Sequence, residues 1–184
     1  MLFRSESTVI QSLTNAALLL KTLKYDMGEQ SVADVYIDLT FGGILAHAVV
    51  AMKSRYPGHG KKVGRLLALM APVKRVTVVD HDVDPSDPTH VEWAMNARFN
   101  PSRDTDIIDD VFFPGDIEPS LPSPTSKNMM GSKIVLDATS KVDSGPFSLP
   151  TPEVMEKSRE LWAQLGLPSL EPIPKRAKFR IFGV

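Results

Sequence analysis

Apolar residues in the first part of the chain recur at intervals of three and four positions, which is the spacing of one helix face. The series consists of Ile10, Leu13, Ala17 and Leu20, with Ala16 and Leu23 beside it. This pattern predicts an amphipathic helix over residues 6–24, followed by a polar connection that contains Gly28.

Two runs with β-strand character flank a pair of glycines. Residues 32–39 are rich in Val, Ile and Tyr, and residues 44–53 resume the run after Gly42 and Gly43. Strand-like runs on both sides of Gly-Gly predict a β-hairpin. A helix over 44–53 is the alternative, because Ala and Leu are frequent there; we prefer the hairpin.

Residues 75–80 (RVTVVD) give the strongest strand signal, since they are β-branched and almost uninterrupted. Such a run predicts a central strand that is buried on both faces. The further predicted elements are a helix over 62–70, a helix from Pro88 to about Phe99 capped by Asp87, strands over 106–112 and 134–138, and a helix from Pro152 to about Gly166 with the apolar stripe Val154, Leu161, Trp162 and Leu165. Strands that alternate with helices predict a three-layer α/β domain with a mixed, largely parallel sheet and an early β-hairpin.

The chain of 184 residues is expected to form one domain over residues 1–170, followed by a basic and apolar tail over 171–184. In this tail, Phe179, Ile181 and Phe182 alternate as in an edge strand. A disordered tail is the alternative.

Charge and composition exclude several classes of function. The net charge is -1, from 21 Lys+Arg and 22 Asp+Glu, so nothing indicates a nucleic acid or an anionic membrane as partner. The chain has no Cys, which excludes disulfides, thiolate nucleophiles and Cys-based metal sites. No apolar run is long enough for a membrane span, and no signal segment stands at the start. We therefore expect a cytoplasmic protein.

The loop Asp80-His81-Asp82-Val83-Asp84 places carboxylates at alternate positions after a strand, as in some Mg²⁺ or Ca²⁺ sites. It departs from a calcium loop, because Pro85 stands at the sixth position and Val91 at the twelfth. Turn formation and helix capping are the preferred interpretation. A metal-dependent enzyme remains a third, weaker hypothesis.

The histidines and glycines nominate no catalytic centre. The four histidines show no known metal spacing, and the chain contains no GxGxxG, P-loop or GxSxG motif. His59 stands at a helix start, where it either caps the helix or binds an anion; the cap is preferred. His47, in a predicted strand, is interpreted as a partly buried histidine whose hydrogen bonds are satisfied.

Three segments carry a resemblance to a known family. They are residues 56–62 (YPGHGKK), residues 76–103 (VTVVDHDVDPSDPTHVEWAMNARFNPSR) and residues 131–141 (GSKIVLDATSK). Their order and spacing are similar to those in the C-terminal domain of UbiD-type (de)carboxylases, and the likeness extends over residues 32–170. Asn100 stands where that family usually has Asp.

The resemblance implies a function that this chain does not perform alone. The family removes CO₂ from, or adds it to, aromatic or unsaturated carboxylic acids, using prenylated FMN with a divalent metal and potassium. The ligands of these cofactors and the catalytic residues lie in an N-terminal domain that precedes this region. We therefore expect no catalytic, cofactor-binding or metal-binding residue here, and a UbiD-like flavin-domain subunit as partner in a homo- or hetero-oligomer.

By position, two loops resemble those that the family presents toward the substrate, where its C-terminal domain closes over the flavin. The residues expected to form the wall of the substrate pocket are Thr40, Phe41, Ile44, Phe112, Phe113 and Leu121. Burial in the core or in a subunit interface is the alternative for both loops. The competing hypothesis of function is a self-associating scaffold or regulatory module without turnover.

Overall fold

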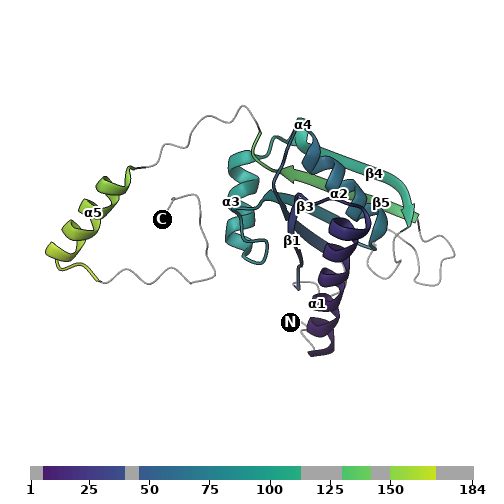
Figure 1. Cartoon of the computed structure of the whole chain (residues 1–184), viewed down its shortest axis with the longest axis horizontal. Helices are drawn as coiled ribbons and strands as arrows, with labels where there is room; N and C mark the ends of the chain where they lie inside the picture. The colour runs from purple at the N-terminus through teal and green to yellow at the C-terminus, as the bar shows by residue number, and fades with distance from the viewer. Residues whose placement is uncertain (1–5, 40–45, 113–129, 142–149, 169–184) are drawn as a thin grey trace.

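The computed structural model describes residues 6–39, 46–112, 130–141 and 150–168, and these form one sheet with helices on both faces (Figure 1). The strands are β1 (Val32–Ile37), β2 (His47–Met52), β3 (Arg75–Asp80), β4 (Thr105–Phe112) and β5 (Met130–Ala138). The helices are α1 (Glu6–Lys21), continued by the π-helical turn η1 (Thr22–Asp26), then α2 (His59–Met70), α3 (Pro88–Arg98), the short α4 (Pro101–Asp104) and α5 (Pro152–Gln164).

The sheet is mixed, with the strand order β1-β2-β3-β5-β4. The three inner strands β2, β3 and β5 run parallel, whereas β1 pairs with β2 and β4 pairs with β5 in antiparallel fashion. The antiparallel pair of β1 and β2 confirms the predicted hairpin and excludes a helix over 44–53. The α/β fold class with a largely parallel sheet is therefore confirmed.

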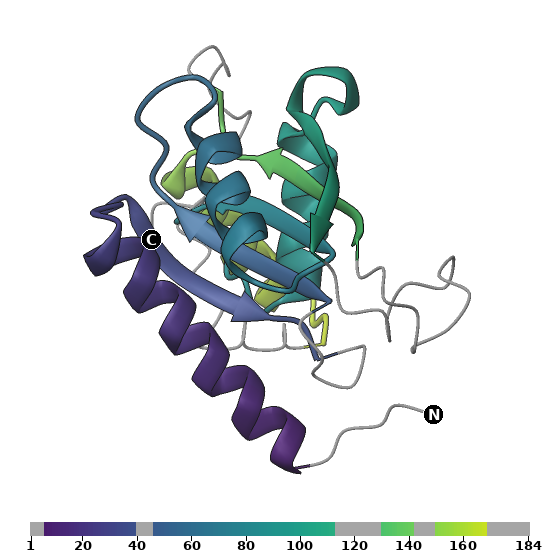
Figure 2. The same ribbon diagram turned by 90° about the vertical axis from the view of Figure 1, so that its right-hand side faces the viewer.

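Two apolar clusters, one on each face of the sheet, hold the three layers together. On one face, α1 and α2 pack on alternate residues of the sheet such as Val50, Val76 and Val78. On the other face, α3 packs on Val49 and Val79. Figure 2 shows α1 and α2 on the side nearest the viewer. Because β3 is paired on both edges and covered on both faces, its predicted central position is confirmed.

Helix α1 is apolar on two faces, and the predicted apolar residues divide between them: Ala16, Leu20 and Leu23 pack in or against the core on the sheet. The buried positions are Ser12 and Leu19, together with Leu23 of η1. Ile10 and Leu13, from the predicted stripe, are 64% and 66% exposed. The helical spacing predicted the helix correctly, but it did not indicate which of its two apolar faces packs on the sheet.

Helix α2 is joined closely to β5 at both of its ends. A Cβ atom added at Gly64 would overlap the side chain of Val135, and one added at Gly60 would overlap the carboxylate of Asp137. At the other end, buried Lys133 donates hydrogen bonds from Nζ to the carbonyl oxygens of Ala68 (2.6 Å) and Ala71 (2.8 Å). The lysine thus satisfies carbonyl groups at the end of the helix, which have no partner inside it.

Helix α5 begins and ends as the sequence predicts, but it packs on nothing that the structure describes. Thr151 caps its first turn, and Gly166 follows it with a φ of 63°. None of its residues is buried, and its apolar stripe is exposed. Figure 1 draws α5 apart from the sheet. The domain boundary at residue 170 stays a prediction, and the predicted tail lies outside the described residues.

Candidate functional site

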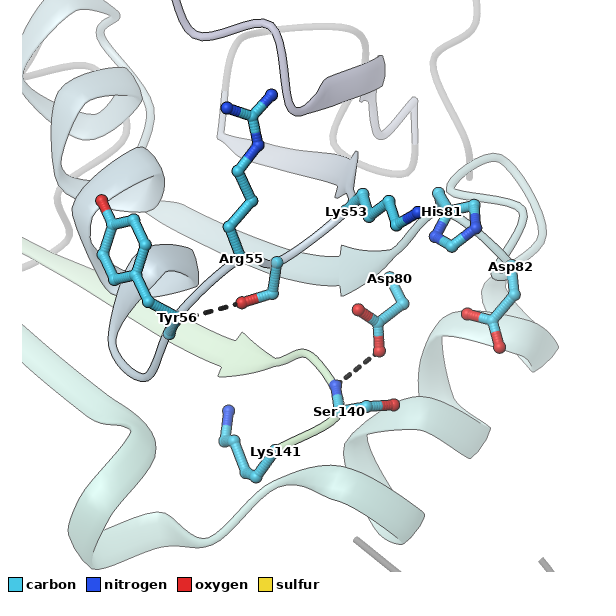
Figure 3. A pocket seen from close by; sticks show the side chains of 9 residues that line it. Lys53, Arg55, Tyr56, Asp80, His81, Asp82, Ser140 and Lys141 are labelled. Atoms are coloured by element: carbon cyan, nitrogen blue, oxygen red, sulfur yellow. Dashed lines mark hydrogen bonds between the residues drawn. The ribbon is translucent and has the colours of Figure 1, made fainter. Parts of the chain in front are cut away.

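The parallel strands β2, β3 and β5 end at one edge of the sheet, and the loops after them line a polar hollow (Figure 3). We call it the strand-end crevice; it is formed by residues 53–58, 80–82 and 139–141. Two adjoining cavities, of about 480 Å³ and 310 Å³, make up the crevice. Open α/β sheets usually bind ligands at this edge, so it is the first place to look for chemistry.

A buried arginine pairs with two carboxylates that line the strand-end crevice, Asp80 and Asp82. Arg98, at the end of α3, donates from Nη1 to Asp80 (3.0 Å) and from Nη2 to Asp82 (2.7 Å), and its guanidinium lies 4.9 Å from the ring centroid of Trp93. Burial on its own raises the pKa of Asp82, but the hydrogen bonds and charge of Arg98 outweigh it and lower this pKa overall. The acidic loop is therefore joined to α3 by ion pairs.

The other side of the crevice repeats this arrangement around Lys141. Its ammonium lies 3.2 Å from the carboxylate of Asp137 and 3.6 Å from that of Asp104, and both carboxylates are buried. Burial on its own raises the pKa of Asp104, but hydrogen bonds from Arg103 and the Asn100 amide lower it overall. Lys141 thus links the end of β5 to α4.

Turn formation and helix capping, the preferred interpretation of the acidic loop, are confirmed. Asp84 accepts hydrogen bonds from the amide and the hydroxyl of Ser86, at 2.8 Å and 2.7 Å. Asp87 caps α3 by accepting from the amide of Thr89 at 2.8 Å. Within the described ranges, no three His, Asp or Glu side chains are grouped so that they could hold a metal ion.

His59 lies behind the crevice at the start of α2 and is fully buried, which differs from its predicted role as a helix cap. The N-cap is Gly58, in the left-handed region at φ 81°, and no side chain caps this helix end. His59 Nδ1 instead accepts from the amide of Arg55 (3.1 Å), and Nε2 lies 3.1 Å from Glu29. The residue holds the 53–58 loop against the connection before β1, because it bonds to both.

Glu29 is buried and accepts from buried Ser31, from buried His59 and from Lys62, whose side chain is more than half exposed. Burial on its own raises its pKa, but hydrogen bonds from these three side chains outweigh it and lower the pKa of Glu29 from 4.5 to about 2. The ionised form is therefore favoured in the folded state. This contribution to stability is fully present above pH 4.5 and is lost as the pH falls toward 2.

We therefore expect Glu29→Gln to flatten the acid side of the stability profile. The free energy of unfolding, measured by urea denaturation at about pH 6 and about pH 3, should fall less between the two values in the variant than in the wild type. Glu156→Gln, in the exposed pair of Glu156 with Arg159, is the control and should leave the difference unchanged. A wild-type slope in the Glu29 variant would contradict this assignment.

His47 is half-buried and satisfied, as the sequence predicts. Its Nδ1 lies 2.8 Å from Nη2 of Arg75 and 3.2 Å from a carboxylate oxygen of Asp38, and its Nε2 lies 3.0 Å from the hydroxyl oxygen of Thr77. Burial and the charge of Arg75 lower the pKa of His47, against the opposing effect of Asp38. The imidazole is thus neutral at neutral pH and braces the starts of β2 and β3.

The ion pairs at the crevice join the segments that line it. Its buried carboxylates lie in ion pairs with Arg98 or Lys141, and a partner cation makes a carboxylate a poorer proton acceptor. The sequence pointed to this edge through the acidic loop. It did not indicate that Arg98 pairs with Asp80 and Asp82 or that Lys141 pairs with Asp104, because these partners are distant along the chain.

Of the predicted pocket wall, only Phe112 lies among the described residues, at the end of β4. Phe112 is the last residue of β4, pairs with Met130 and is 57% exposed. The other five predicted residues, Thr40, Phe41, Ile44, Phe113 and Leu121, lie outside the described residues. Both loops nevertheless leave the sheet at the edge where β2 and β5 begin, since one precedes His47 and the other precedes Met130. The structure does not test whether they meet.

The sheet and its covering helices form a class of α/β domain that also occurs in known proteins. Residues 8–138 match the family model described as the 3-octaprenyl-4-hydroxybenzoate carboxy-lyase C-terminal domain, UbiD_C. The chain belongs to this UbiD C-terminal domain family, as its motifs indicate. An uncharacterized protein of Aeropyrum pernix is 35% identical over 146 residues, which cover 72% of this chain and 28% of that protein.

Solved structures agree with the family. The UbiD-class enzyme HmfF from Pelotomaculum thermopropionicum, in complex with FMN, is similar with a TM-score of 0.68 and 25% identity, over 82% of this chain and 33% of that chain. The closed form of the vanillic acid decarboxylase ShVdcCD from Sedimentibacter hydroxybenzoicus is similar with a TM-score of 0.66 and 30% identity, over 87% and 33%. The chain spans about a third of the length of these relatives. No helix in the described part of the chain is long and apolar enough to cross a membrane.

Proposed function

We propose that this chain is the C-terminal part of a UbiD-type (de)carboxylase that acts on aromatic or unsaturated carboxylic acids. It contributes a lid, a pocket wall and oligomer contacts, and a UbiD-like flavin-domain subunit supplies prenylated FMN, a divalent metal and potassium. The observation that carries this proposal is that the chain matches one third of UbiD-class chains. In keeping with it, the ion pairs of the strand-end crevice already engage its buried carboxylates.

The relatives support the assembly that we propose. HmfF structures are described with FMN and with prFMN. ShVdcCD is described with a separate VdcD chain, in open and closed forms. The open and closed forms of ShVdcCD support the lid role that we propose for this domain. We expect the assembly in the cytoplasm.

The residues that we propose for the pocket wall are Thr40, Phe41, Ile44, Phe112, Phe113 and Leu121. Support comes from the sheet, since the loops that hold them leave it at one edge. An apolar wall there would exclude water from a substrate carboxylate, and loss of CO₂ is easier from a desolvated carboxylate. The strand-end crevice, at the other edge, then serves to hold the strand ends together.

Coexpression tests this function. The full chain is produced with and without the UbiD-class chain encoded nearest to its gene, in a host that makes prenylated FMN. We expect no flavin absorbance and no exchange of labelled CO₂ with aromatic acids from the chain alone, and both from the complex. Turnover by the isolated chain, or a complex that binds prenylated FMN but exchanges no CO₂ with any aromatic or unsaturated acid, would contradict the proposal.

A self-associating scaffold or regulatory module is the second candidate. It is favoured by the apolar stripe of α5, where Val154, Leu161 and Leu165 are 51%, 54% and 64% exposed. Such a module would form oligomers by itself, as measured by light scattering, and would leave the turnover of any partner unchanged. The coexpression experiment separates the two, because only the first candidate requires turnover in a complex.

A further inference from the structure

The outer face of α1 and η1 carries more apolar surface than a helix facing only water needs. Ile10, Leu13 and Leu18 are 64%, 66% and 56% exposed, and Tyr25 of η1 is 69% exposed. With Ala17 between them, they follow one another at helical spacing along the side that faces away from the sheet. We call Ile10, Leu13, Ala17, Leu18 and Tyr25 the outer stripe.

Contacts with this chain's own sheet do not account for the outer stripe. The inner face of α1 already packs on the sheet through Leu19, and η1 does so through Leu23. A helix that covers a sheet needs one apolar face and normally presents polar residues on the other. Helix α2 follows that rule, because its exposed positions include Lys62 and Arg65 and a single large apolar residue, Leu69. Contiguous exposed apolar residues mark a surface that another protein covers.

The comparisons indicate which protein that is. The matched family model describes a C-terminal domain and begins at residue 8, in the first turn of α1. This chain corresponds to about a third of the solved relatives, so the remaining part of such a chain precedes this domain. In a relative, the preceding part is therefore joined at the N-terminal end of the helix that corresponds to α1. Ile10 and Leu13 lie within two turns of that junction.

We propose that the outer stripe binds the N-terminal part of a UbiD-class enzyme. The inference rests on the proposed function and adds the surface through which the partner is held.

The test compares two leucines of equal type and similar exposure. Leu13→Gln lies in the outer stripe, and Leu69→Gln lies on α2, where the exposed fraction is 62% against 66% for Leu13. The full chain, as wild type or as either variant, is titrated with the purified UbiD-class chain encoded nearest to its gene. We expect Leu13→Gln to weaken binding at least tenfold, and Leu69→Gln to leave it within twofold of the wild type. Thermal melting of each free variant checks that the fold is kept.

Each outcome bears on one of the two proposals. If the wild type binds its partner and the two variants bind as tightly as the wild type, the outer stripe is not the binding surface and the proposed function stands. The outer stripe is also not the binding surface for this partner if Leu13→Gln only dissociates a dimer of this chain, measured by light scattering, without weakening the heterocomplex. If the wild type binds no UbiD-class chain, the proposed function fails and the inference fails with it. Leu18→Gln is a second variant in the stripe and should weaken binding in the same direction.

Discussion

Replacing Arg98 by Met is expected to lower the free energy of unfolding by about 3–5 kcal/mol. Arg98 is buried, and its guanidinium is the cation that pairs with both Asp80 and Asp82. Met keeps much of the apolar stem, so the variant removes the charge and leaves two partly buried carboxylates without their partner. Urea denaturation at neutral pH, with the wild type in parallel, measures the change.

The matched control is an arginine in an exposed ion pair. Arg159 lies 2.9 Å from Glu156 on α5, and both side chains are more than half exposed. Exposed pairs of this kind contribute about 0–1 kcal/mol, so Arg159→Met should change the free energy of unfolding by less than that. If Arg98→Met costs no more than Arg159→Met, the ion pairs at the strand ends do not stabilise the fold as we describe.

Gly64→Ala is expected to destabilise the protein by about 1–3 kcal/mol, although Ala is the better helix former by about 1 kcal/mol. The added methyl group would overlap Val135 of β5 and would lie 3.1 Å from Val78 of β3. Both neighbours are β-branched residues of the sheet and are fully buried, so neither can move aside easily. The change is read from thermal or urea unfolding.

A double-mutant cycle isolates this contact from every other effect of the substitution. Val135→Ala alone leaves a cavity and is destabilising. In the double variant, the methyl group at position 64 fills part of that cavity. The pair should therefore cost at least about 1 kcal/mol less than the sum of the two single changes. Additive costs would show that α2 and β5 do not meet at Gly64.

The elements that the sequence predicted correctly are those fixed by local patterns. The run RVTVVD is β-branched at its four central residues, so it identified β3 and its burial on both faces. Asp87 followed by Pro88 marked the start of α3, because both residues act within one turn. The strand-like runs before and after Gly42-Gly43 identified the β-hairpin, because this signal is also local in the sequence.

What the sequence could not predict depends on contacts between distant segments. Helical spacing does not say which of two apolar faces of α1 meets the sheet. Helix α4 is only four residues long and is held by the side chain of Asn100, which accepts from the Ser102 amide. The sequence predicted the helix that carries Arg98, but the role of Arg98 as the cation between Asp80 and Asp82 depends on how α3 crosses the sheet.

The candidate site was predicted in part. Family likeness placed the pocket wall in two loops, and only Phe112 of those six residues falls within the described structure, at the end of β4. Of the strand-end crevice, the sequence indicated only the acidic loop Asp80-His81-Asp82-Val83-Asp84. The walls of the crevice include residues as far apart in the sequence as Lys53 and Lys141, and no local motif indicates the pairing of Lys141 with Asp104.

The place of β5 in the sheet constrains the order in which the chain can fold. This strand comes last in the sequence of the sheet, yet it lies between β3 and β4. While a ribosome is still making residues 81–129, one edge of β3 has no native partner, and that edge is RVTVVD, a segment with high β-propensity. The nascent domain therefore has an unpaired, aggregation-prone edge on β3 until Ala138 has emerged from the ribosome. The yield of folded protein in cells should rise when the segment between β4 and β5 is translated faster, or when a chaperone covers β3 during that interval.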